Sequence, residues 1–154
     1  MLFEVHILYL AWFISIVSFC LFIPREKQRN AQLNLLFMQF LTWFLGLFVV
    51  NLNLIQYPVR FFAEANGSSF TFEFLAYPVI CALFNEYYPE HKGKFTKFRY
   101  CTIICSALTV LEIILENHTQ LIKYINWNGY LTWSSIFITL YISRLYNRWY
   151  FKIP

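Results

Sequence analysis

Two glutamates at the edges of apolar runs are the residues of this chain whose position is best suited to chemistry. Glu112 lies about one turn from the end of an apolar run over 100–115, and Glu73 opens a run over 72–88. A carboxylate at the centre of a bilayer costs about 2.5–3.5 kcal/mol, so such groups are usually paired, protonated or functional. In the alternative interpretation, Glu112 reaches outer water beside Lys123, and Glu73 complements the positive end of a helix dipole.

Three further polar residues complete the candidate ligand or ion pathway: Thr109, Asn53 and Arg144. Thr109 and Glu112 share one helical face, and Asn53 extends a similar stripe in the run over 33–55, because polar residues recur there at steps of three and four. Arg144 lies in the last run, where it either reaches water along its aliphatic stem or pairs with Glu86. Such stripes indicate either a polar pathway along a helix bundle or simple packing through small residues.

The chain lacks the patterns of known catalytic and metal sites. It contains no GxSxG, no HExxH, no phosphate-binding glycine loop and no aspartate at all. Glu4, His6, Glu116 and His118 gather toward one predicted side, but without the spacing of a helical metal site. We therefore expect no metal and no cofactor, and we favour a role other than catalysis.

The composition predicts a membrane protein. Of the 154 residues, 59% are hydrophobic and 13% are charged, whereas about 25% of residues are charged in a typical soluble domain. The apolar residues form runs near the ~20 residues that cross a bilayer. We predict one all-α domain over 1–154, a bundle of five transmembrane helices at about 3–23, 33–55, 72–88, 100–115 and 127–146.

The basic residues predict the orientation of these spans. All but two lie in the first loop, in the third loop or near the C-terminus: Arg25, Lys27, Arg29, Lys92, Lys94, Lys97, Arg99, Arg144, Arg148 and Lys152. Only Arg60 and Lys123 fall in the other loops. The positive-inside rule then places the N-terminus outside and the C-terminus in the cytoplasm. Bases grouped in short loops indicate insertion into a bilayer, so we expect no nucleic-acid partner.

Aromatic residues at the ends of the runs agree with these boundaries, since amphipathic rings prefer the membrane interface. They are Tyr57, Tyr87, Tyr88, Tyr100, Tyr124, Trp127, Trp149 and Tyr150. The segment over 56–71 is amphipathic and holds the turn signal Asn66-Gly67-Ser68. We expect it either to lie on the outer surface or to re-enter the membrane.

Several motifs resemble those of a family of small, uncharacterised, multi-pass integral membrane proteins from spore-forming Gram-positive bacteria. They are Tyr57-Pro58-Val59-Arg60, Ser69-Phe70-Thr71-Phe72-Glu73-Phe74, Tyr77-Pro78-Val79-Ile80, Tyr87-Tyr88-Pro89 and Ile125-Asn126-Trp127-Asn128-Gly129-Tyr130 with Thr132-Trp133. The resemblance covers most of the chain. It implies a bacterial plasma or spore membrane, brings no known activity and transfers no functional residues.

Three functions remain compatible with these patterns. The protein binds or transports a small ion or amphipathic ligand, it is a structural or accessory membrane subunit, or it is an intramembrane enzyme that acts on lipid. The lipid bilayer is the expected environment in each case, with a second copy of the chain or another membrane protein as a possible partner.

Overall fold

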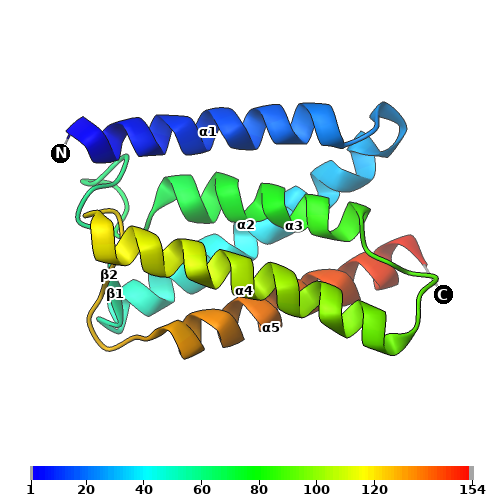
Figure 1. The fold of residues 1–154 in the computed structure, drawn as a ribbon. Coiled ribbons are helices and arrows are strands. Elements are labelled where there is room, and N and C mark those ends of the chain that lie inside the picture. The colour runs from blue at the N-terminus through cyan, green and yellow to red at the C-terminus, as the bar shows by residue number, and fades with distance from the viewer. Residues whose placement is uncertain (1, 153–154) are drawn as a thin grey trace.

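The computed structural model describes residues 2–152 and is 75% helical. These residues form five α-helices that run back and forth in one bundle, so that the two chain termini lie at opposite ends (Figure 1). The helices are α1 (Leu2–Phe22), α2 (Gln28–Asn51), α3 (Tyr77–Glu86), α4 (Lys94–His118) and α5 (Gly129–Phe151). A 3-10 turn, η1 (Arg25–Lys27), precedes α2, and a π-helical segment, η2 (Phe70–Ala76), runs directly into α3.

Local sequence explains several of the helix ends. Pro24 is extended (ψ 143°) and separates α1 from η1, because proline cannot continue a helix interior. The side chain of Asn128 caps α5 by accepting a hydrogen bond from the Leu131 N–H at 3.0 Å, and Ser69 caps η2 in the same manner. Ser, Thr, Asp and Asn are the residues that satisfy free N–H groups at helix starts.

The second helix ends earlier than its apolar run. We predicted a span to residue 55, but α2 ends at Asn51 and Asn53 adopts a left-handed conformation (φ 53°). Ile55 and Gln56 form strand β1 (Ile55–Gln56), which pairs antiparallel with β2 (Lys123–Tyr124). The side chain of Ile55, within this small sheet, is buried. The apolar residues that we interpreted as the end of a helix therefore pack as part of a strand. We call this end of the bundle the sheet end, and the opposite end, which holds η1 and the α3–α4 connection, the basic end.

Three helical stretches are long and apolar enough to cross a membrane: Leu2–Phe22, Arg25–Asn51 and Lys94–His118. Their outward faces are apolar, and Phe13, Phe40 and Ile103 are each more than half exposed. Large apolar side chains along whole helix faces suit hydrocarbon rather than water. Together these features indicate a membrane protein.

Helix α3 occupies the middle of the bundle and packs against α1, α2 and α5. Only about 25 Å of helix is formed by residues 70–86, which is short for the ~30 Å hydrocarbon layer of a bilayer. The side chains of Val79, Cys81 and Phe84 are nevertheless almost fully buried. Because α3 is short and central, its side chains lie mainly inside the protein rather than against lipid.

The loop over 57–69 is irregular and folds back over the sheet end. Arg60 holds it together by donating hydrogen bonds to the backbone carbonyls of Tyr57 (2.6 Å), Ala63 (3.0 Å) and Asn66 (2.7 Å). The Val59 N–H donates to the Gln120 carbonyl at 3.0 Å and ties the loop to the α4–β2 connection. Its depth relative to a bilayer stays a prediction.

Two backbone carbonyls of the π-helical segment η2 lack the regular α-helical donor four residues further on. The Tyr77 N–H donates to the Phe72 carbonyl, five residues back, which leaves the Glu73 carbonyl free. Pro78 has no N–H for the Phe74 carbonyl. Both carbonyls are satisfied from α2, since the Thr42 hydroxyl donates to Glu73 O and Gln39 Nε2 donates to Phe74 O at 2.9 Å. Hydrogen bonds from two polar residues of α2 therefore stabilise the irregular turn at Glu73.

Replacing Gln39 by Leu should lower the free energy of unfolding by about 1 kcal/mol, because the Phe74 carbonyl loses its donor. In a Pro78→Ala background the same replacement should cost less, since residue 78 regains an N–H that can reach that carbonyl. Thermal unfolding of the four proteins in detergent measures both losses. Equal losses in the two backgrounds would contradict this role of Pro78.

Candidate functional site

Glu112 is held inside the bundle by three hydroxyl groups. Its side chain is 9% exposed. Oε2 accepts a hydrogen bond from Tyr77 at 2.6 Å, and Oε1 accepts hydrogen bonds from Tyr124 at 2.7 Å and Thr132 at 2.8 Å. The donors come from α3, β2 and α5. The cage therefore satisfies both oxygens of this buried carboxyl group from within the protein.

Trp127 adds one hydrogen bond within the cage, while the hydroxyls of Thr132 and Tyr124 both donate to Glu112 Oε1 and lie side by side. The Thr132 hydroxyl lies 2.9 Å from the Tyr124 hydroxyl and accepts a hydrogen bond from Trp127 Nε1 at 2.8 Å. Burial and the neighbouring charge of Glu112 raise the pKa of Tyr124 above its ordinary value. Tyr124 therefore remains a protonated donor at neutral pH, and the indole of Trp127 fixes the position of the central hydroxyl.

Glu73 has a different environment. Its side chain is 4% exposed, and within residues 2–152 no hydrogen-bond partner reaches its buried Oε2. The carboxyl group lies directly against Gly46 of α2, where an added Cβ would overlap it. A buried carboxyl oxygen without a donor favours the neutral acid or a bound positive charge.

The two carboxyl groups share one cavity of about 130 Å³, which lies between α2, α3, α4 and α5. This is more space than one water molecule needs. Hydroxyls of Thr42, Ser135 and Thr139 line the cavity together with the two glutamates, and none of its described lining residues is Lys, Arg or His. We call it the carboxylate cavity. It has acidic and neutral polar groups but no basic side chain in its wall.

A second cavity of about 270 Å³ lies between α1, α3 and α4, and its wall is mainly apolar. Tyr77 and Glu112 line both cavities. The hydrogen-bonded pair therefore lies between two cavities whose walls are both mainly apolar, and the smaller one also contains the Glu73 carboxyl group.

The other predicted pathway residues lie elsewhere. Thr109 is buried one turn before Glu112, but its hydroxyl donates to its own helix at Cys105 O (2.8 Å) and does not line the carboxylate cavity. Asn53 is exposed beyond the end of α2. Arg144 is 6% exposed at the opposite end of the bundle. Of the five predicted residues, only Glu73 and Glu112 come together.

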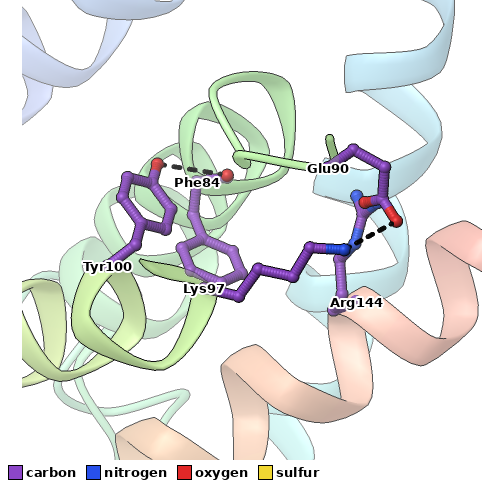
Figure 2. Close-up of polar contacts among 5 residues, drawn as sticks. All are labelled: Phe84, Glu90, Lys97, Tyr100 and Arg144. Carbon is purple, nitrogen blue, oxygen red and sulfur yellow. Dashed lines mark hydrogen bonds and ion pairs between the residues drawn. The ribbon is translucent and has the colours of Figure 1, made fainter. Parts of the chain in front are cut away.

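Two predicted pairings are corrected. Arg144 forms an ion pair with Glu90 rather than Glu86 (Figure 2), and Glu86 pairs with Lys27 at 2.7 Å. Glu86 ends α3 and lies beside η1, whereas Glu90 lies in the turn that follows Pro89. Lys123 is exposed, and the hydrogen bonds to Glu112 come from hydroxyl groups instead.

The residues that complete the site were not predicted as site residues. Tyr57, Tyr124 and Trp127 were interpreted as interfacial anchors, Thr132 was predicted only as part of the polar stripe of the last run, and Tyr77 appeared only in a motif of the family resemblance. The composition held a signal for these residues. A buried carboxylate needs hydrogen-bond donors, and in a chain with few charged residues those donors must come from hydroxyl and indole groups. Which ones turn inward depends on the fold.

Comparison of the chain with protein-family models, with curated proteins and with solved structures found no match. The resemblance to the bacterial membrane family therefore stays a prediction, and the geometry of the site is the basis for the function considered next.

Gly46→Ala should lower the free energy of unfolding by about 1–3 kcal/mol, because the new methyl group overlaps the Glu73 carboxyl. The loss should be smaller when Glu73 is also replaced by Ala. Gly67→Ala is the matched control, since a Cβ there meets only Val50 Cγ1 at 3.4 Å. Chemical or thermal unfolding in detergent gives the coupling between positions 46 and 73. Additive losses would show that Gly46 does not make room for the carboxyl.

Proposed function

We propose that the protein is a five-span membrane protein that binds a proton or a small cation at Glu73 and Glu112 and carries it across the bilayer. The observation that carries the proposal is the carboxylate cavity, where two buried carboxyl groups line one space without a basic side chain among its described lining residues. Two uncompensated negative charges in a low-dielectric interior repel each other strongly. A proton or a bound cation removes that cost.

The two carboxyl groups suit different parts of this role. Glu112 accepts hydrogen bonds from three hydroxyls and serves as the group with a fixed position. Glu73 has a buried oxygen that no described residue contacts through a hydrogen bond, so it is the group that gains and loses the proton or contacts the cation. Intramembrane acids arranged in this manner mark ion and proton paths in other membrane proteins.

Transport also requires that the cavity open toward each side in turn. Three apolar residues in the wall of the carboxylate cavity, Met38, Ile136 and Leu140, also belong to the buried cluster in the middle of the bundle. That cluster separates the cavity from the basic end. We propose that it is the barrier which must move for an ion to pass.

We further propose that all five helices span the membrane, with the basic end in the cytoplasm. Support comes from the alternating direction of the helices and the opposite positions of the termini (Figure 1). The loops at the basic end and the end of α5 carry nearly all of the basic residues, as the positive-inside rule requires. The membrane is then the cell membrane of a bacterium, in line with the family that the sequence resembles.

Purified protein in liposomes should conduct protons or Na⁺ or K⁺, measured with a pH-sensitive dye and with ion-selective electrodes. Glu73→Gln and Glu112→Gln should each reduce the flux by about tenfold or more, because an amide neither titrates nor holds a cation as a carboxylate does. Glu116→Gln, one turn further along α4 and outside the cavity wall, should conduct like the natural protein.

Thermal unfolding of each variant distinguishes a lost pathway from a lost fold. If the natural protein conducts no more than protein-free liposomes, transport is excluded and a structural or accessory subunit becomes the better proposal. The amphipathic-ligand and lipid-enzyme hypotheses stay predictions.

The orientation is tested with reporters at two positions. A fluorescent protein that matures only in the cytoplasm should fluoresce when fused after residue 152 and remain dark when inserted beside Glu64, in the loop at the sheet end. An alkaline phosphatase reporter should give the reverse result. Fluorescence at both positions would contradict the proposal that α3, α4 and α5 all cross the membrane, since three crossings separate the two reporters.

A further inference from the structure

A third cavity, of about 700 Å³, lies at the basic end and has charged and amide side chains in its wall. It is bounded by η1 and the start of α2, by the end of α3 and the following turn, and by α4 and α5. We call it the polar basin. Its wall includes Lys27, Asn34, Asn85, Glu86, Glu90, Lys97, Arg144 and Asn147, with Ala31 and Phe151 as apolar members. It shares no lining residue with the carboxylate cavity.

The basin carries an excess of positive charge. Lys27 pairs with Glu86 at 2.7 Å, while Lys97 (3.5 Å) and Arg144 both pair with Glu90 (Figure 2). Three cations therefore face two carboxylates, and these ion pairs leave one positive charge over. The Arg144 guanidinium also lies 4.3 Å from the centroid of the Tyr88 ring, which holds its plane in place.

Several buried polar atoms of the basin have no hydrogen-bond partner within residues 2–152. They are the Nε of Arg144, the Oδ1 of Asn34 and the Oδ1 of Asn85. Asn85 is fixed in this orientation because its Nδ2 donates to Cys81 O at 3.0 Å and to Ser143 Oγ at 2.7 Å. Arg144, Asn34 and Asn85 are 6%, 3% and 8% exposed. Buried polar atoms of this kind are costly unless something bonds them.

We infer that the polar basin binds a phosphate ester whose alcohol part carries hydroxyl or amino hydrogens. An anionic acceptor would balance the excess positive charge and accept a hydrogen bond from the free Arg144 N–H. Phosphate is such an acceptor, and its oxygens match the geometry of arginine. The unbonded Oδ1 atoms of Asn34 and Asn85 would be satisfied by hydrogen-bond donors on the same ligand. Basic pockets between membrane helices hold phospholipid headgroups by this chemistry, and a free sugar or glycerol phosphate offers the same groups.

The binding test uses the full chain in detergent, with calorimetry as the measurement. Glycerol phosphate should bind saturably and about tenfold more tightly than propyl phosphate, which has the phosphate without the hydroxyl donors. Arg144→Gln should weaken the binding of glycerol phosphate about tenfold or more. Arg148→Gln is the matched control, because Arg148 is on the same helix, exposed and outside the basin.

Asn34→Ala provides a second variant that does not remove an ion pair, and it should erase most of the preference for glycerol phosphate over propyl phosphate. Binding of dihexanoyl phosphatidylglycerol and dihexanoyl phosphatidylcholine then shows whether the phosphate ester is a lipid headgroup or a soluble molecule. Binding of the glycerol lipid well above free glycerol phosphate assigns the site to a lipid headgroup, and equal binding assigns it to a soluble ester. Absence of binding by every probe, or binding that Arg144→Gln and Asn34→Ala leave unchanged, would overturn the inference.

Discussion

A polar group inside this bundle must be bonded either by the protein itself or by a ligand that the protein binds, because the faces around it are apolar and a bilayer core provides no water. The π-helical turn before α3 is where this requirement is most demanding. One carbonyl is freed by the widened turn and the next by Pro78, and α2 supplies a hydroxyl and an amide at matching positions. The irregular turn would otherwise leave two buried acceptors unpaired, each at a cost of about 1–3 kcal/mol.

That turn decides where the acidic chemistry is located. It carries Glu73, which it directs against Gly46 on the neighbouring helix, and it continues into α3, where Tyr77 reaches Glu112 on α4. A regular helix over the same residues would rotate Glu73 and Tyr77 relative to each other. π-helical turns recur at functional sites for this reason, and here one of them links the two carboxyl groups that we propose as the ion site.

The two ends of the bundle satisfy their buried charges by different means. At the sheet end, carboxyl groups are surrounded by tyrosine and threonine hydroxyls, with no ion pair among the contacts described for Glu112. At the basic end, carboxylates pair with lysine and arginine in a wide polar space. A narrow site without a counter-charge suits a small positive ion, and a wide site with surplus positive charge suits a larger anion. The apolar cluster around Met38 and Leu140 keeps the two spaces apart.

The sequence by itself determined the class of structure. Hydrophobic runs, prolines and the distribution of bases are local properties, so they predicted a helical bundle, most of its helices, and Glu73 and Glu112 as the acids of interest. They did not predict that α2 stops at Asn51, because the apolar residues after it satisfy a strand as well as a helix. They also misassigned the partner of Arg144. The number of spans and the orientation stay predictions.

Only the tertiary structure decided which side chains meet. Tyr77 lies 35 positions before Glu112 in the chain and Tyr124 lies 12 positions after it, yet both hydroxyls bond the same carboxylate. Thr109, on the predicted face of Glu112, bonds its own helix instead, and Asn53, on the predicted stripe of the second run, is exposed. Spacing along one helix defines a face, but the rotation of each helix in the bundle, and the loops that fold back over its end, determine what that face contacts. Those depend on packing between distant segments, which no local pattern records.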